Sequence, residues 1–272
     1  MGQSAVFVPL SDDNPLRKIQ LQWVTGTLIL LNVIIYGLEL TPAGQSMAAS
    51  FAIVPSELFT VGIVGGSARG PFDVIAVPEW MTLVSYMFLH GDLLHLGANM
   101  LFLWVFGDNV EDALGHARYL AFYLLCGVAA ALVHAYMSPI SKLPLIGASG
   151  AVAGVIAAYL LLHPHVRVWV LAFRVIPLRI TASLALGAWI ATHVVMVVLQ
   201  SCGDSLQFGQ CVWRVVGPHP TTGAANGDGV AWWAHIGGLV AGVFFLLVLR
   251  PAGVELFQRP PPAPPSSPPA SA

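Results

Sequence analysis

Two polar side chains, Ser149 and His235, lie within apolar stretches of this sequence and together could carry out nucleophilic chemistry. A serine hydroxyl is a weak nucleophile until a neighbouring base accepts its proton, and histidine is a common base. Ser149 opens one apolar run, within Gly147-Ala148-Ser149-Gly150, and His235 lies in a second run. Polar groups inside a membrane are costly and usually functional. The pair therefore predicts acyl chemistry, such as peptide hydrolysis, performed within a membrane.

His95 and Asn99 could stabilise the oxyanion that such a reaction forms. They are four residues apart in an earlier apolar segment, so a helix would place them on one face. Both side chains can donate hydrogen bonds, as can the free backbone N–H groups where Ser149 begins a helix. No acidic residue is apparent at the same depth to orient His235, so the sequence predicts a Ser-His dyad.

Each of these residues also has a purely structural interpretation. Ser149 alone could be a helix N-cap, and His235 could bond a backbone carbonyl. His95 and Asn99 could join two helices. At 1.5 Å per residue, Ser149, His235 and His95 lie roughly 21, 22 and 20 Å from the expected cytoplasmic ends of their helices. This shared depth favours a common site.

The remaining polar groups in the apolar segments are interpreted as non-catalytic. His90 and Asp92 are expected near the membrane interface, and His163, His165 and His193 are expected to be structural.

The composition is that of an integral membrane protein. Of 272 residues, 57% are hydrophobic and 9% are charged, and the mean hydropathy is +0.78. Soluble proteins carry about 25% charged residues. The basic residues are scattered, without the basic run that nucleic acid binding needs. Nucleic acid is therefore excluded as a partner, and the lipid bilayer is expected.

Six apolar segments predict an all-α, polytopic bundle of six transmembrane helices. The segments are 21–40, 81–106, 117–137, 149–163, 177–199 and 230–249. We expect a cytoplasmic polar tail over 1–20, a six-helix protease domain over 21–250 and a disordered, Pro-rich cytoplasmic tail over 251–272. The run that Ser149 opens is too short to cross the membrane fully.

The distribution of basic residues predicts the orientation. With the N-terminus in the cytoplasm, eight of the 11 Lys and Arg residues face inside, as the positive-inside rule requires. Both termini are then cytoplasmic, and the site opens to the outer side of a membrane that we expect to be a bacterial inner membrane. Cys202 and Cys211 fall in an outer loop, where a disulfide is allowed but not required.

Small residues at spacings of four predict that two of these helices touch. Gly150 and Gly154 form one pair, and Ala234, Gly238 and Gly242 form a second stripe. Such stripes let helix backbones approach closely. A hydrogen bond between Ser149 and His235 requires that approach.

Taken together, these motifs resemble those of the rhomboid intramembrane serine proteases, over about residues 78–250. The patterns are His90, His95 and Asn99 as H-x4-H-x3-N, Gly107 and Glu111 as G-x3-E, Gly147 to Gly150 as G-x-S-G, and Ala234 to Gly242 as A-H-x-x-G-x-x-x-G. One departure is that the family's Trp-Arg motif ahead of F-L-H is replaced by Trp80-Met81.

The resemblance implies an endopeptidase in which Ser149 is the nucleophile and His235 the general base. It assigns His95, Asn99 and the Ser149 N–H to the oxyanion hole, and implies no metal and no cofactor. Substrates would be single-pass membrane proteins cut near the outer surface, with the loop 200–229 and the fifth helix as cap and gate.

Two other functions stay open on the sequence alone. One is a non-catalytic relative that binds membrane clients, although such proteins generally lack the serine or the histidine. The other is a small transporter, although no inverted repeat is evident. The oligomeric state is open, and a weak homo-oligomer is one option.

Overall fold

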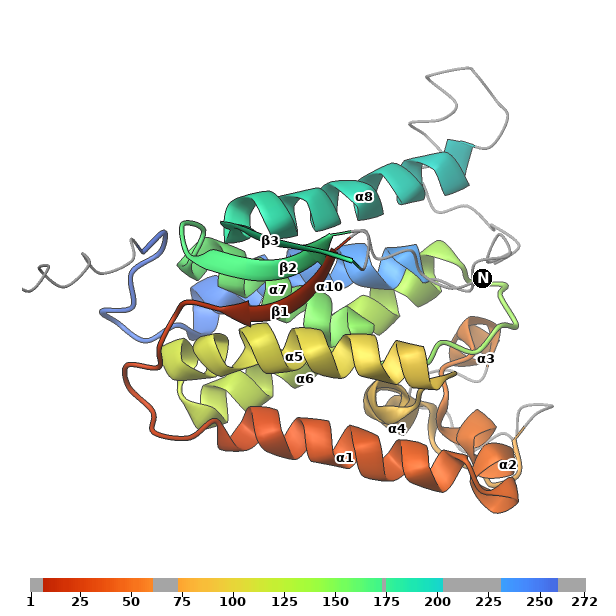
Figure 1. Cartoon of the computed structure of the whole chain (residues 1–272). Helices are drawn as coiled ribbons and strands as arrows, with labels where there is room; N and C mark the ends of the chain where they lie inside the picture. The colour runs from red at the N-terminus through yellow and green to blue at the C-terminus, as the bar shows by residue number, and fades with distance from the viewer. Residues whose placement is uncertain (1–6, 61–72, 173–174, 203–230, 259–272) are drawn as a thin grey trace, which may run out of the picture.

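The computed structural model describes residues 7–60, 73–172, 175–202 and 231–258 (Figure 1). Long helices account for most of them. These are α1 (Trp23–Glu39), α5 (Leu93–Leu114), α6 (His116–Met137), α7 (Ser149–Leu162), α8 (Ala182–Cys202) and α10 (Trp232–Leu249). Shorter helices precede α5, namely α2 (Pro42–Phe51), α3 (Pro55–Thr60), α4 (Glu79–Ser85) and the 3-10 turn η1 (Tyr86–Phe88).

Helix α7 forms the centre of the bundle. Helices α5, α6 and α10 pack around it, and Figure 1 shows α1 and α8 at opposite edges. All of its residues are buried except Ser149, Leu160 and Leu161, which are half-buried. The first residue of the innermost helix is thus the predicted nucleophile.

The apolar helices confirm an integral membrane protein. Among the described residues, three helices are long and apolar enough to cross a membrane: α6, α8 over Ala182–Leu199, and α10. Helices α1 and α7 are apolar but shorter. Four predicted segments match a helix to within two residues at each end: 21–40, 117–137, 149–163 and 230–249. The count of six spans remains a prediction.

The second predicted segment, 81–106, is not one helix. It is divided between α4, η1 and α5, and the break lies at residues 89–92. Asp92 has extended backbone and its side chain accepts the N–H of His95 at 2.8 Å, so it caps the start of α5. Helix α5 then runs past the predicted end to Leu114, where Gly115 has a φ of 77°.

The prediction of an all-α fold was wrong in one respect, because the chain also forms a three-stranded antiparallel sheet. Its order is β1 (Phe7–Asp12), β2 (Arg167–Ala172), β3 (Ile176–Thr181). Strand β2 alternates, with Val168 and Val170 buried and Arg167 exposed, as one buried sheet face requires. Strand β1 comes from the expected polar tail, and β3 takes the first residues of the expected fifth span.

The start of the Pro-rich tail is ordered. The N–H groups of Phe257 and Gln258 donate to the carbonyls of Leu161 and Leu162 at 2.7 and 2.8 Å. Those carbonyls end α7 and have no partner within the helix. Residues 259–272 lie outside the described residues, as do Cys211 and residues 203–229 of the expected cap 200–229.

Glu111 joins α1 to α5. Its fully buried carboxylate accepts the N–H groups of Val24 and Thr25 at 3.0 and 2.8 Å, and the Thr25 hydroxyl at 2.7 Å. These N–H groups belong to the first turn of α1, where a negative charge is favourable. The G-x3-E motif therefore has a structural role in this fold.

Candidate active site

Helices α7 and α10 touch backbone to backbone through paired glycines. A Cβ atom placed on Gly238 would lie 2.0 Å from the carbonyl oxygen of Gly150, and one on Gly242 would lie 2.4 Å from that of Gly154. No side chain larger than hydrogen fits at either contact. The predicted close approach of the two glycine stripes is confirmed.

This contact sets the relative level of Ser149 and His235. The pairs Gly150–Gly238 and Gly154–Gly242 advance by four residues on both helices, so α7 and α10 run in the same direction. Ser149 precedes Gly150 by one residue and His235 precedes Gly238 by three. The two side chains therefore differ in height by two residues, roughly 3 Å. Among the described residues, no hydrogen bond yet joins them.

Ser149 is the first residue of α7, and its hydroxyl does not cap the helix. Ala148 occupies the N-cap position, and the structure shows no side-chain capping bond there. The alternative that Ser149 is an N-cap is therefore wrong. Its side chain is half-buried and lies at the helix end where free N–H groups collect.

His235 is 4% exposed and is enclosed by aromatic side chains. Its ring centroid lies 6.0 Å from Trp189 and 4.8 Å from His193, both on α8, and 6.1 Å from Trp232 on α10. Its Nδ1 atom is buried with no hydrogen-bond partner among the described residues. Within that part of the chain, the alternative that His235 bonds a backbone carbonyl is therefore not met at Nδ1.

His193 is a neighbour of His235 that the sequence interpretation missed. Its Nδ1 lies 2.7 Å from the carbonyl oxygen of Trp189, one turn earlier on α8. Because a carbonyl only accepts, Nδ1 of His193 must carry the hydrogen. Two apolar runs each contain a Trp followed by a His: Trp189 and His193 are four residues apart, and Trp232 and His235 are three apart. This repeated pattern was the available signal in the sequence.

His95 and Asn99 meet the turn that leads into α7. A Cβ atom on Gly147 would lie 2.6 Å from Cε1 and 2.7 Å from Nε2 of His95, and 3.8 Å from Nδ2 of Asn99. Gly147 also has a φ of 116°, which side-chain-bearing residues rarely adopt. Its N–H donates to the Tyr86 carbonyl at 2.9 Å. Two hydrogen-bond donors thus face the backbone two residues before Ser149.

His90 belongs to this cluster, although the sequence predicted no part for it in the site; its interfacial depth stays a prediction. It is 4% exposed, and its Nε2 lies 3.1 Å from Nδ2 of Asn99. Since the amide nitrogen donates, Nε2 of His90 accepts and its Nδ1 carries the hydrogen in the neutral ring. His90 thereby helps to fix the orientation of the Asn99 amide.

Comparison with known protein families matches residues 77–252 to the Rhomboid domain. This stretch covers well over half of the chain. The chain belongs to the rhomboid family.

Individual relatives of this rhomboid include enzymes from bacteria. It is 30% identical over 172 residues to rhomboid protease GluP of Bacillus subtilis, and 29% identical over 150 residues to rhomboid protease AarA of Providencia stuartii. It is 27% identical over 173 residues to mitochondrial rhomboid protein 1 of Saccharomyces cerevisiae. These matches cover 63%, 50% and 62% of this chain, but only 26%, 49% and 42% of the respective relatives.

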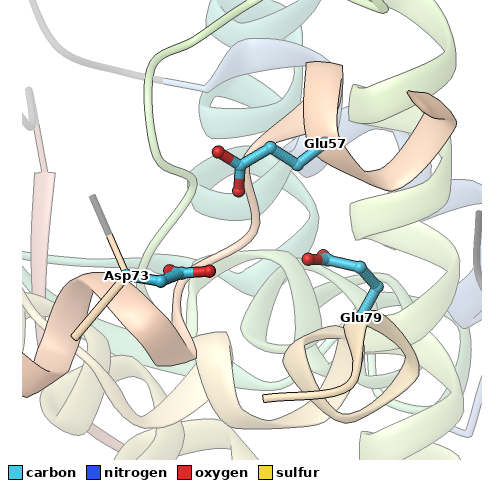
Figure 2. Close-up of side chains that lie close together, drawn as sticks. All are labelled: Glu57, Asp73 and Glu79. Atoms are coloured by element: carbon cyan, nitrogen blue, oxygen red, sulfur yellow. The ribbon is translucent and has the colours of Figure 1, made fainter. Parts of the chain in front are cut away.

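The described part of this rhomboid also holds one group of side chains that could bind a metal ion. The carboxylates of Glu57 on α3, Asp73, and Glu79 on α4 point toward one another, with oxygens within 4.8 Å (Figure 2). Burial, followed by the charges of Glu57 and Asp73, raises the pKa of Glu79 to about 7. Such acidic groups also occur without a metal, and none of the three belongs to the cluster around Ser149.

Proposed function

We propose that this rhomboid is an intramembrane serine endopeptidase that uses Ser149 and His235 as a catalytic dyad. The observation that carries the proposal is the backbone contact of α7 and α10 at Gly150 and Gly238. This contact supports a pairing of the hydroxyl and the imidazole, because it leaves them roughly 3 Å apart in height at the same end of two parallel helices. The names of the bacterial relatives support the same class of activity.

In the acylation step, Oγ of Ser149 attacks the carbonyl carbon of the scissile peptide bond. The imidazole of His235 accepts the hydroxyl proton, and the carbonyl π electrons move onto oxygen. When this tetrahedral intermediate collapses, the C–N bond breaks and the imidazolium delivers its proton to the leaving nitrogen. Water then hydrolyses the acyl-enzyme by the same sequence, with His235 again as the base.

The oxyanion would be stabilised by His95, Asn99 and the N–H of Ser149. The contact of Gly147 with His95 and Asn99 brings these side chains to the turn before Ser149. The N-terminus of α7 adds its free N–H groups and positive dipole end. Donors fixed in this way stabilise the developing charge without reorganising.

The substrates would be single-pass membrane proteins, cut where the start of α7 meets the outer part of the bilayer. Helix α7 has 14 residues, which is roughly 21 Å and less than the hydrocarbon core of about 30 Å. Ser149 would therefore lie below the outer surface, within reach of a transmembrane segment. We place this protein in a bacterial inner membrane with both termini in the cytoplasm.

The test is cleavage of a single-pass substrate by the full chain in liposomes. Ser149→Ala and His235→Ala are each expected to abolish detectable cleavage, a loss of roughly 10⁴-fold or more, while thermal unfolding stays close to wild type. Ser183→Ala, at the exposed start of α8, is the matched control and should cleave normally. Cleavage retained in His235→Ala would show that His235 is not the catalytic base. Binding of a membrane protein without cleavage by the wild type would favour the non-catalytic alternative.

A further inference from the structure

A polar cavity of about 270 Å³ lies at the opposite end of α7 from Ser149. Its walls come from four parts of the chain: the segment before α1, the end of α5, the end of α7, and the segment after α10. The residues that matter for its chemistry are Arg17, Lys18, Asp112, His163 and Glu255. None of them takes part in the proposed hydrolysis.

Arg17 and Lys18 are two exposed cationic residues in the lining of this cavity. The carboxylate of Asp112 does not pair with them, because its oxygens accept the backbone N–H groups of Arg17, Lys18 and Ile19 at 3.2, 2.6 and 2.8 Å. Those bonds fix the backbone that carries both cations. In the part of the chain that the structure describes, neither side chain forms a salt bridge.

His163 adds a buried group without a partner. It is 6% exposed, its ring packs against Tyr159 at 5.3 Å, and its Nδ1 has no hydrogen-bond partner among the described residues. A buried nitrogen without a partner is unfavourable, so an occupant that bonds it is favoured. His163, Arg17 and Lys18 all belong to the lining of the same cavity.

The cavity lies where lipid headgroups are expected. Trp23 is 65% exposed and opens α1 five residues after Lys18, and exposed Trp residues mark the membrane interface. Leu21, between them, is 54% exposed and offers apolar surface beside the cavity. In the orientation that we propose, this is the cytoplasmic leaflet, which carries the anionic lipids.

We propose that this cavity binds the phosphate group of an anionic phospholipid headgroup. The guanidinium of Arg17 and the ammonium of Lys18 would pair with the phosphate oxygens, and His163 would bond one of them. Glu255, which is exposed, can accept a hydrogen bond from a headgroup hydroxyl. The volume is below the roughly 300–1,000 Å³ of pockets for drug-sized ligands, so the acyl chains would stay outside, along α1.

The experiment measures thermal unfolding of the full chain in detergent during titration with short-chain phosphatidylglycerol. Diacylglycerol of the same chain length supplies the chains without the phosphate, and inorganic phosphate supplies the anion without the chains. Arg17→Gln and Lys18→Gln are compared with Arg118→Gln, which removes the same charge at an exposed position of α6 that does not line the cavity.

Phosphatidylglycerol should stabilise the wild type and Arg118→Gln alike, and the apparent affinity should fall about tenfold in either cavity variant. If inorganic phosphate stabilises the protein less than phosphatidylglycerol does, the bound phosphate belongs to a lipid. If the two stabilise it equally, the same site binds a soluble phosphate. The proposal is overturned if diacylglycerol stabilises as well as phosphatidylglycerol. It is equally overturned if no ligand stabilises, or if Arg118→Gln loses as much affinity as Arg17→Gln.

Discussion

Gly238 of α10 lies so close to the carbonyl oxygen of Gly150 in α7 that even a methyl group would come within 2.0 Å of it. This contact fixes the distance between the two helices that carry Ser149 and His235. The overlapping atom is a backbone oxygen, so a side-chain rotation could not relieve the overlap.

Gly238→Ala should therefore separate the helices. We expect a loss of about 1–3 kcal/mol in the free energy of unfolding, and a loss of about 10²-fold in substrate cleavage, since a displacement of about 1 Å can have that effect. The matched control is Gly97→Ala, because nothing lies within 4 Å of a Cβ atom there. Equal activity of the two variants would show that helix separation does not matter.

Gly147→Ala tests the contact between the turn and the oxyanion donors. Gly147 combines a φ of 116° with a Cβ position 2.6 Å from His95. Gly115 has a φ of 77° and free space around its Cβ position, so Gly115→Ala isolates backbone strain. We expect Gly115→Ala to lose about 1–3 kcal/mol of stability and Gly147→Ala at least as much, but only Gly147→Ala to lose cleavage by about 10²-fold or more. Parallel losses of activity would contradict this assignment.

His193 is expected to position His235 rather than to react. His193→Ala removes the ring packed at 4.8 Å from His235 and should lower kcat by roughly tenfold. His193→Phe keeps a ring there and should retain most of the activity, with an unchanged pH profile. Thr192→Ala, on the exposed side of α8, is the control. A new pH dependence in His193→Phe would instead indicate that His193 takes part in proton transfer.

Stability should depend on the protonation of Glu79. The pKa of its carboxyl is raised from 4.5 to about 7, so the folded protein retains a proton that the unfolded chain releases. The free energy of unfolding is therefore expected to fall as pH rises from 4.5 to 7 and then to level off. Glu79→Gln, which imitates the protonated group, should remove this slope. A wild-type stability that rises over the same interval would contradict the assignment.

Much of the bundle could be predicted because its signals are local. Apolar length located α1, α6, α7 and α10, and the spacing of Gly150, Gly154, Gly238 and Gly242 predicted the contact between two of them. The number of residues from the cytoplasmic helix ends predicted that Ser149 and His235 lie at a similar depth. The four-residue spacing of His95 and Asn99 placed them on one helix face. These inferences need only the helix repeat and the thickness of a bilayer.

The parts that were missed depend on contacts between distant residues. Strand β1 pairs with β2, so that Phe7 lies opposite Ala172, and no local sequence pattern predicts so distant a partner. The break before α5 was hidden within a continuous apolar run, although Asp92 is a good N-cap. His193 was set aside because its partner lies on a different helix. Residues 251–258 were judged by their prolines, whereas backbone bonds to the end of α7 order them.

The pairing of Ser149 with His235 can be tested by covalent capture with a 4-chloroisocoumarin. This reagent acylates a serine and then exposes an electrophile that alkylates a histidine within reach. Peptide mass spectrometry of the labelled full chain should find one inhibitor molecule joining Ser149 to His235, and Ser149→Ala should not be labelled. Labelling that persists in Ser149→Ala, or an adduct that joins Ser149 to a different residue, would contradict the account.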